Sequence, residues 1–283
     1  MRTNENLKML SIERAANILE QADCLIIAAG AGMGVDSGLP DFRGTDGFWK
    51  AYPSLREAGI EFTSIAAPQT FISHPCRAWG FYGHRLALYR DRTPHDGFPI
   101  LKKWAGNLDF GYSVFTSNVD GQFQKAGFDP QRVVECHGSI HHLQCMDACR
   151  SAIWDATDFE PLVDETKCEL MNASPTCPHC GSIARPNILM FNDGNWLEDR
   201  TEQQQRRQQL FLSKVKRPLV IEMGAGTHIP SVRHFSHRII QEYNGRLIRI
   251  NPTDSKVPTP MDIGLQMGAL QALRLIDAEL MGR

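Results

Sequence analysis

The residues with the most distinctive chemistry lie in one glycine-rich segment, A-A-G-A-G-M-G-V-D-S-G-L-P-D-F-R-G, at positions 28–44. Glycines let a backbone approach a pyrophosphate closely, and the N-terminus of a following helix favours the phosphate charge. Val35 stands where a hydride-transfer dehydrogenase would have its third glycine, so that class of enzyme fits poorly. An acid, an aromatic and a cation then follow in a row, at Asp41, Phe42 and Arg43. These side chains could bind ribose or phosphate and cover a reactive face of a ligand, so the segment predicts a nucleotide site with its own chemistry.

The cysteines indicate a metal site. Four of the eight fall in two close pairs, Cys145/Cys149 and Cys177/Cys180. The N-terminal stretch MRTNENLKML has no apolar run, so we expect no signal peptide and a cytoplasmic protein. In such a compartment, close cysteine pairs favour metal binding over disulfides.

Short apolar runs alternate with helical patterns along the chain, which predicts an α/β fold with an open, mostly parallel sheet. A first helix is expected at Ser11–Gln21 with Ser11 as its N-cap, and a last helix at about Gly264–Leu280. The expected buried strands are Leu25–Ala28, Tyr112–Thr116, Arg132–Glu135, Leu219–Met223 and Arg246–Ile250.

Two stretches interrupt this alternation. Residues 50–99 read as helices and loops, and residues 139–190 hold the paired cysteines. We interpret them as a helical insert and a metal-binding module that together form a small lobe. The large nucleotide-binding domain then consists of residues 1–49, 100–138 and 191–283.

The composition argues against nucleic-acid and membrane partners. Hydrophobic residues make up 42% of the 283, and the net charge is −2, so no strong field attracts nucleic acid or anionic lipid. No stretch approaches the roughly 20 apolar residues of a membrane span. The polar run RTEQQQRR, at 200–207, is read as a solvated helix face.

The G-A-G…S-G-L-P-D-F-R-G run resembles the NAD-binding signature of the sirtuins. The resemblance implies a Rossmann-like fold and an enzyme that consumes NAD. It assigns NAD contacts to six residues of the glycine segment: Gly30, Ala31, Gly32, Asp41, Phe42 and Arg43.

Further sirtuin-like motifs follow in order. Thr116-Ser117-Asn118-Val119-Asp120 resembles T-Q-N-I-D, which implies that Ser117, Asn118 and Asp120 line the nicotinamide-ribose pocket, with serine replacing the usual glutamine. Cys136-His137-Gly138 resembles the catalytic H-G motif, so His137 is the expected general base, since histidine titrates near neutral pH. The following His141 and His142 are expected to have packing or surface roles.

The cysteine pairs resemble the structural zinc module of the sirtuins. That likeness implies Zn²⁺ on Cys145, Cys149, Cys177 and Cys180, with Cys168 as a possible substitute. Four thiolates leave no open coordination position, so the zinc should be structural.

Three later segments also resemble sirtuin motifs, two of them with substituted residues. Residues 185–193, R-P-N-I-L-M-F-N-D, resemble R-P-x-V-V-x-F-G-E, a loop that pairs with the substrate peptide and places Phe191 at the substrate. The segment Gly224-Ala225-Gly226 stands where G-T-S is usual, and Asn251 matches an asparagine near the adenosine ribose.

A tyrosine and an arginine offer a clue to the acyl group. Tyr82 and Arg85 lie three apart on an expected helix, hence on one face, and together could bind a carboxylate. With the small residue Ala66 upstream, they resemble the Y-x-x-R of sirtuins that remove succinyl, malonyl or glutaryl groups. An ordinary helix surface is the alternative reading.

The resemblance implies an NAD-dependent protein lysine deacylase that releases nicotinamide and an acyl-ADP-ribose, with Asn118 and His137 as catalytic residues and an acylated protein or peptide as substrate. The departures at Ser117, 225–226 and 192–193 keep open an ADP-ribosyltransferase or NAD hydrolase on the same fold. A non-catalytic NAD-sensing module is a second alternative.

Overall fold

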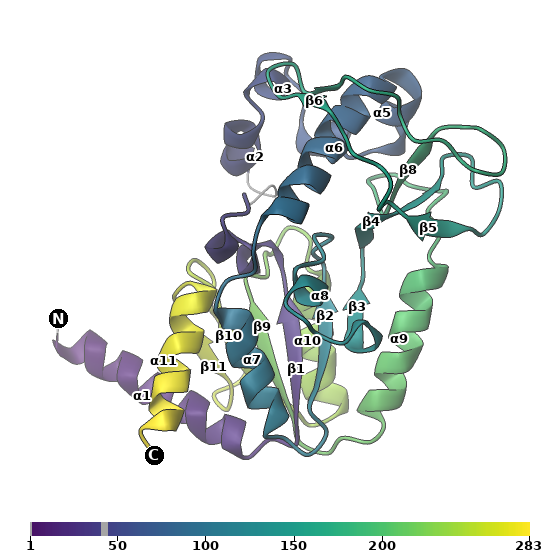
Figure 1. Ribbon diagram of the computed structural model, residues 1–283. Coiled ribbons are helices and arrows are strands. Elements are labelled where there is room, and N and C mark those ends of the chain that lie inside the picture. Colours follow the sequence, from purple (N-terminus) through teal and green to yellow (C-terminus); the bar gives the residue numbers. More distant parts are fainter. Residues whose placement is uncertain (1, 41–44) are drawn as a thin grey trace.

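The core of the molecule is a six-stranded parallel sheet. The structure, a computed structural model, describes residues 2–40 and 45–283. The strands stand in the order β11-β10-β9-β1-β2-β3, so the chain builds one half outward from β1 and then returns to build the other (Figure 1). This is the predicted Rossmann-like sheet. Its strands are β1 Cys24–Ala29, β2 Tyr112–Thr116, β3 Val133–Glu135, β9 Pro218–Met223, β10 Arg246–Ile250 and β11 Ile263–Leu265.

Helices cover both faces of this sheet, because successive residues of a strand point to opposite sides. In β1, Leu25 and Ile27 enter the core under α1 (Arg2–Glu20), α7 (Gly97–Gly106) and α11 (Ala269–Met281). Their neighbours Cys24, Ile26 and Ala28 enter the core under α9 (Asp199–Leu212) and α10 (Ser231–Glu242). Burial on both faces explains why the strands read as continuous apolar runs.

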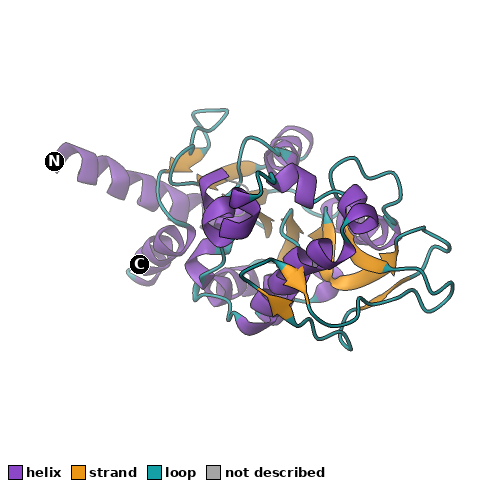
Figure 2. Cartoon of the chain, turned by 90° about the horizontal axis from the view of Figure 1, so that it is seen from above, coloured by secondary structure: helices purple, strands orange, loops and turns teal. Residues whose placement is uncertain are grey.

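α1 and α11 lie on the same side of the molecule (Figure 2). Near the chain end, Arg283 binds the Glu20 carboxylate of α1 at 2.6 Å. Within residues 2–40 and 45–283, no helix combines the length and apolarity needed to cross a lipid bilayer.

A small lobe stands above the carboxyl ends of the strands (Figure 1). Trp79 of α6 (Pro75–Asp91) donates its indole N–H to the Ala184 carbonyl of β8 (Ala184–Ile188) at 2.9 Å, which joins this helix to the strand. Against β7, a Cβ on Gly80 would lie 2.2 Å from the Cys168 carbonyl oxygen, so only glycine permits this approach. The lobe contains α2 Thr45–Ala51, α3 Pro53–Glu57, α4 Phe62–Ile65, α5 Pro68–Ser73, α6 Pro75–Asp91, β4 Gly138–Cys145, β5 Ile153–Asp155, β6 Val163–Asp164, β7 Glu169–Leu170 and β8 Ala184–Ile188.

The strands of this lobe form a three-stranded antiparallel sheet, β5-β4-β8, and a β6–β7 pair. Its core is separate from the two that flank the parallel sheet, and draws on α2 to α6 as well as on β4 and β8. The predicted lobe of a helical insert and a cysteine module is therefore present, while its exact sequence boundaries stay a prediction.

Three sequence expectations about helices were wrong. α1 begins at Arg2, and Ser11 lies inside it, donating its hydroxyl to the Leu7 carbonyl at 3.0 Å instead of capping the helix. The expected last helix starts only at Ala269, because 263–265 pair with β10 as strand β11. Short-range periodicity does not reveal a pairing partner elsewhere in the sheet.

The polar run at 200–207 is helical, as expected, but it is only partly solvated. Gln204 accepts a hydrogen bond from the Glu135 backbone N–H at 3.0 Å, and Gln208 donates to the Ser113 hydroxyl at 2.9 Å. One face of α9 therefore satisfies polar groups at the β3 edge of the sheet, which glutamine can do while buried.

A buried ion pair closes the loop after β8. Arg185 and Asp193 form two hydrogen bonds, of 2.7 and 2.9 Å, and both side chains are 0% exposed. The same carboxylate accepts the backbone N–H groups of Met190 and Asn195 at 3.2 and 3.1 Å. Asp193, which replaces the glutamate of the sirtuin motif, is thus a structural residue of the loop.

We predict that Asp193→Ala lowers the free energy of unfolding by about 3–5 kcal/mol, because it leaves a buried guanidinium unpaired. Urea denaturation measures this change. Glu202→Ala is the matched control, since its 2.7 Å pair with Arg206 is exposed and contributes about 1 kcal/mol or less. Equal, small losses in both variants would contradict a structural role for Asp193.

Candidate active site

Three loops converge at the carboxyl edge of the parallel sheet. Ala29, the last residue of β1, pairs with Thr116 of β2 and with Met223 of β9. The loops after these strands therefore start at the same level, at the point where the order of strands reverses. In open α/β sheets, ligands bind in the crevice at this point.

The backbones of two of these loops touch. The Gly30 N–H donates to the Met223 carbonyl at 2.9 Å, and the Gly32 N–H donates to the Gly224 carbonyl at 3.1 Å. A Cβ on Gly32 would lie 2.7 Å from the Gly224 Cα, and Gly224 has a φ of 59°. Only residues without a side chain permit the two loops to pack this closely, and glycines at a sheet edge also let a dinucleotide approach the backbone. The glycine segment thus fits the NAD that the sequence predicts.

Asn118 and Asp120 follow β2 and face the same edge. The Asn118 side chain donates to the Gly30 carbonyl at 2.9 Å. The Asp120 carboxylate accepts the Gln122 N–H at 2.9 Å, at the start of α8 (Gln122–Lys125). Burial raises the pKa of Asp120 to about 6, and Glu135 adds to the rise while Arg85 opposes it. This carboxyl group therefore titrates close to neutral pH inside the site.

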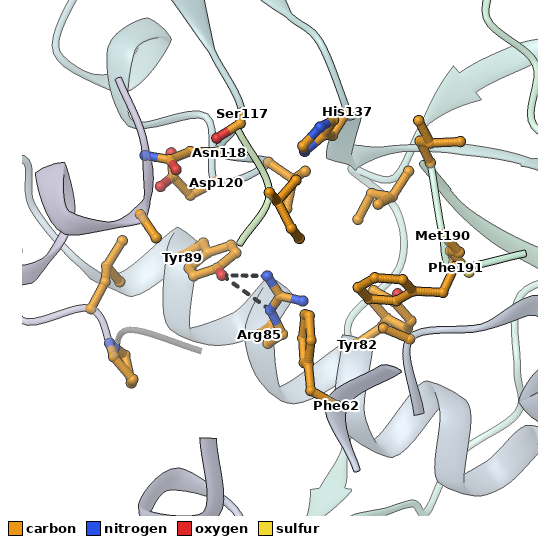
Figure 3. Close-up of a pocket in the computed structure, with 18 residues that line it drawn as sticks. Phe62, Tyr82, Arg85, Tyr89, Ser117, Asn118, Asp120, His137, Met190 and Phe191 are labelled. Atoms are coloured by element: carbon orange, nitrogen blue, oxygen red, sulfur yellow. Dashed lines mark hydrogen bonds between the residues drawn. The ribbon is translucent and has the colours of Figure 1, made fainter. Parts of the chain in front are cut away.

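One cavity of about 250 Å³ joins the sheet edge to the small lobe. Figure 3 shows His137, Asn118 and Asp120 on one side of it, with Arg85 and Phe191 on the other. The cavity is lined by Ala31, Leu39, Pro40, Phe62, Ala66, Tyr82, Arg85, Tyr89, Ser117, Asn118, Val119, Asp120, His137, Ile188, Leu189, Met190, Phe191 and Ile229. Nine of the residues predicted from sequence are thus brought together: Ala31, Ala66, Tyr82, Arg85, Ser117, Asn118, Asp120, His137 and Phe191.

His137 lies in the two-residue link between β3 and β4. Its Nε2 lies 3.1 Å from the hydroxyl of Ser231, the first residue of α10, and its backbone carbonyl accepts the Leu189 N–H at 3.0 Å. The half-buried imidazole is thereby positioned at the cavity wall. The neighbouring His141 instead packs against the Asp120 carbonyl, 2.9 Å from its Nε2, as expected for a packing residue.

Arg85 places a buried cation in the cavity wall. The side chain comes from α6 and the residue is only 8% exposed. Burial opposes its charge, but the surrounding Tyr89, Tyr52 and Tyr82 outweigh burial and keep the pKa of Arg85 above its ordinary value. Burial raises the pKa of Tyr82 to about 12, so its phenol stays neutral and can donate a hydrogen bond.

Aromatic side chains close the cavity on the side of the small lobe. The Phe191 N–H donates to the Ala66 carbonyl at 3.0 Å. The Phe191 ring meets Phe62 edge-on, with centroids 5.7 Å apart. Asn192 follows with a φ of 55°, a left-handed conformation that asparagine tolerates where the sirtuin motif has glycine.

The other predicted NAD residues lie at the sheet edge or outside the described residues. Asn251 donates its side-chain N–H to the Ala225 carbonyl at 3.1 Å, beside Gly224 and away from the cavity lining. Gly30 and Gly32 also lie at this edge. Asp41, Phe42 and Arg43 fall outside the described residues.

Sequence reasoning missed Tyr89, Phe62 and Met190, which also line the cavity. Tyr89 had a readable signal, since it lies four residues after Arg85 and therefore on the same helix face. Phe62 and Met190 carried no comparable signal, because an apolar residue in a loop or short helix has many possible environments.

The four predicted zinc ligands form one cluster. Their sulfur atoms all lie within 4.8 Å of one another, with 3.5 Å between Cys145 and Cys180 and 3.7 Å between Cys149 and Cys177. A tetrahedral site with Zn–S bonds of about 2.3 Å has sulfur atoms about 3.8 Å apart, so the geometry fits zinc. Cys168 lies instead in the buried core of the small lobe.

Comparison with known protein families agrees with the family resemblance of the sequence motifs. A family model described as the Sir2 family matches residues 30–213, which is more than half of the chain. The chain belongs to the Sir2 family. The match begins at the glycine segment and extends through the cysteine module to α9, which confirms the resemblance to the sirtuins.

Curated relatives match this Sir2-family chain over most of its length. A protein of Pyrobaculum aerophilum named NAD-dependent protein deacylase 2 is 28% identical, and the match covers 93% of each chain. The NAD-dependent protein deacylase of Thermococcus kodakarensis is 26% identical over 88% of each.

Solved structures share the fold. A complex of a Sir2 homologue with NAD has a TM-score of 0.70 at 22% identity, covering 95% of this chain and 94% of that one. A Sir2 complex with a deacetylated p53 peptide and acetyl ADP-ribose has a TM-score of 0.61 at 20% identity, covering 94% and 96%.

We predict that the purified protein contains one zinc ion per chain and that Cys177→Ser abolishes metal binding and lowers Tm, because zinc binding supplies folding free energy. Elemental analysis and thermal melting measure both effects. Cys168→Ala serves as the control and should retain its zinc. Zinc retained by Cys177→Ser but lost from Cys168→Ala would refute the assigned ligand set.

Proposed function

We propose that this Sir2-family protein is an NAD-dependent protein lysine deacylase that releases nicotinamide and O-acyl-ADP-ribose, and that it accepts acidic acyl groups. The observation that carries the proposal is a single cavity bordered by His137, Asn118, Asp120 and Arg85. Family membership and the deacylase names of its relatives support the reaction class.

NAD would bind across the sheet edge as a co-substrate and supply a ribose carbon whose bond to nicotinamide breaks. The diphosphate would lie beside the glycine contact between Gly32 and Gly224, and Asn251, which donates to the Ala225 carbonyl, would lie at the adenosine end. Asn118 and Asp120 would hold nicotinamide and its ribose. An Asp120 carboxyl group with a pKa of about 6 can accept or donate a hydrogen bond near neutral pH.

His137 would act as the general base. In the proposed order, the acyl-lysine carbonyl oxygen replaces nicotinamide at the ribose carbon. The imidazole then takes the proton of a ribose hydroxyl, whose oxygen attacks the acyl carbon. Water releases the lysine and the acyl-ADP-ribose. The Ser231 hydroxyl, 3.1 Å from Nε2, lies where it can orient the ring.

Arg85 and Tyr82 would bind the carboxylate of a succinyl, malonyl or glutaryl group. Arg85 donates two hydrogen bonds to the Tyr89 hydroxyl, which hold the guanidinium in the cavity wall. A carboxylate entering the cavity would meet this charge in a buried environment, where charge-assisted hydrogen bonds are strong. This arrangement supports acidic-acyl recognition over an ordinary helix surface.

The substrate that carries the acyl-lysine would be a protein or peptide. The loop at 189–191 borders the cavity, and its Leu189 and Phe191 N–H groups donate to the His137 and Ala66 carbonyls. That position suits an added peptide strand. A Sir2 protein of the same fold binds a deacetylated peptide, which supports the same substrate class here. A cytoplasmic location stays a prediction.

An ADP-ribosyltransferase or NAD hydrolase remains the alternative. Two of the departures that suggested it have structural explanations, since Asn192 adopts the glycine-like conformation and Asp193 pairs with Arg185. A transferase would place label from adenosine-labelled NAD on protein without any acyl-peptide. A non-catalytic NAD-sensing module would bind NAD without releasing nicotinamide.

We predict that His137→Ala lowers the rate of deacylation of an acyl-lysine peptide by about 10²- to 10⁴-fold, the usual effect of losing a general base. Chromatographic separation of the peptide products measures the rate, and zinc content and Tm should stay at wild-type values. His74→Ala removes an exposed histidine outside the cavity lining and is the control. Wild-type turnover by His137→Ala would exclude the assigned base.

We also predict that Arg85→Met lowers the ratio of succinyl to acetyl kcat/KM by about 10- to 100-fold, because charge-assisted hydrogen bonds contribute about 1.5–3 kcal/mol. A panel of acetyl-, succinyl- and malonyl-lysine peptides with NAD gives the ratio. Arg77→Met, on the same helix but paired with Glu169 at 3.9 Å, is the matched control. An unchanged ratio in Arg85→Met would rule out acidic-acyl recognition by this residue.

A further inference from the structure

Tyr89 extends the polar face of α6 by one turn beyond Arg85. It lies four residues after Arg85 and seven after Tyr82, so all three side chains share one face of the helix. Each borders the cavity, and Tyr89 is only 4% exposed. The residue therefore belongs to the wall that the proposed acyl group would meet.

The Tyr89 hydroxyl holds the Arg85 guanidinium at two points. Arg85 donates from Nε at 3.0 Å and from Nη2 at 2.9 Å to the same phenol oxygen. The guanidinium carbon also lies 5.5 Å from the centre of the Tyr89 ring and 5.2 Å from that of Phe81. An arginine side chain carries a large rotamer entropy, so these contacts help to hold the cation in one orientation.

The orientation of Arg85 matters because the carboxyl group of Asp120 lines the same cavity. In Figure 3 the Tyr89 ring lies between Asp120 and the Arg85 guanidinium. Asp120 and Arg85 line the same cavity, and the arginine charge opposes the rise in the pKa of Asp120. Opposite charges in a buried site attract strongly, and a direct contact would turn Arg85 away from the acyl group and toward the nicotinamide side.

We propose that Tyr89 is a specificity-positioning residue: its hydroxyl orients Arg85 toward an acidic acyl group, and its ring keeps Arg85 apart from Asp120. The inference rests on the proposed deacylase function. Tyr89 has no chemical step of its own, because its effect on the substrate passes through the guanidinium. Loss of the hydroxyl and loss of the ring should therefore have different consequences.

Removing the hydroxyl tests the first part. Tyr89→Phe keeps the ring but removes the acceptor of both bonds, so the ratio of succinyl to acetyl kcat/KM should fall about tenfold, mainly through a higher KM for the succinyl peptide. Tyr112→Phe is the matched control, since its hydroxyl accepts the Asp129 N–H at 2.8 Å and lies outside the cavity lining. It should leave the ratio unchanged.

Removing the ring tests the second part. Tyr89→Leu removes the ring between Arg85 and Asp120, so Arg85 could contact Asp120, which is proposed to hold nicotinamide and its ribose. Inhibition by added nicotinamide should therefore weaken in this variant and stay at the wild-type level in Tyr89→Phe. Equal inhibition of wild type and Tyr89→Leu would overturn the separating role of the ring.

A double-mutant cycle separates positioning from a general structural effect. In an Arg85→Met background, Tyr89→Phe should no longer change the acyl ratio, whereas an effect that persists there would overturn the proposal. A wild-type preference for succinyl peptide that Tyr89→Phe leaves intact would overturn positioning alone. A wild-type enzyme that does not accept succinyl peptide would overturn both this proposal and acidic-acyl recognition.

Discussion

The active site depends on a two-residue connection between the two sheets. β3 ends at Glu135 and β4 begins at Gly138, so this connection from the large sheet to the small lobe consists of Cys136 and His137. On one side, Thr201 and Gln204 of α9 bind the backbone of Glu135. On the other, Gly138 has a φ of 78°, and a Cβ there would lie 2.0 Å from the Asn187 carbonyl oxygen. Contacts at both ends therefore position the backbone of His137 at the cavity.

The same connection explains why recognition and catalysis share one cavity. The sheet edge supplies Asn118, Asp120 and the contact between Gly32 and Gly224. The small lobe supplies Arg85 from a helix whose indole bond to β8 fixes its position. Because β8 also pairs with β4, α6, which carries the proposed acyl-binding residues, is connected to His137 through strand hydrogen bonds.

Much of this arrangement could be predicted from the sequence because it depends on local patterns. Strands buried on both faces are continuous apolar runs, and the carboxyl ends of neighbouring parallel strands must meet at one edge. The resemblance to the sirtuin motifs then assigned residues as far apart in sequence as Ala31 and His137 to one site. The tyrosine and arginine of α6 were found because helical spacing puts them on one face.

The remaining features depend on contacts distant in sequence. The three residues of β11 form a strand only because β10 lies beside them, and the glutamines of α9 are buried only because the sheet edge offers partners. The length of α1 was misjudged because serine also occurs inside helices, where it bonds to a preceding carbonyl. The bonds of Tyr89 to Arg85 depend on rotamers that no sequence pattern specifies.

The central claim is that nicotinamide release and acyl transfer occur together in this one cavity. The most direct measurement is the molar ratio of O-succinyl-ADP-ribose to nicotinamide, determined by mass spectrometry for the wild-type enzyme with NAD and a succinyl-lysine peptide. We predict about one acyl-ADP-ribose for each nicotinamide, and neither product without the peptide. Nicotinamide accompanied by free ADP-ribose or by modified protein, with no acyl-ADP-ribose, would contradict the account.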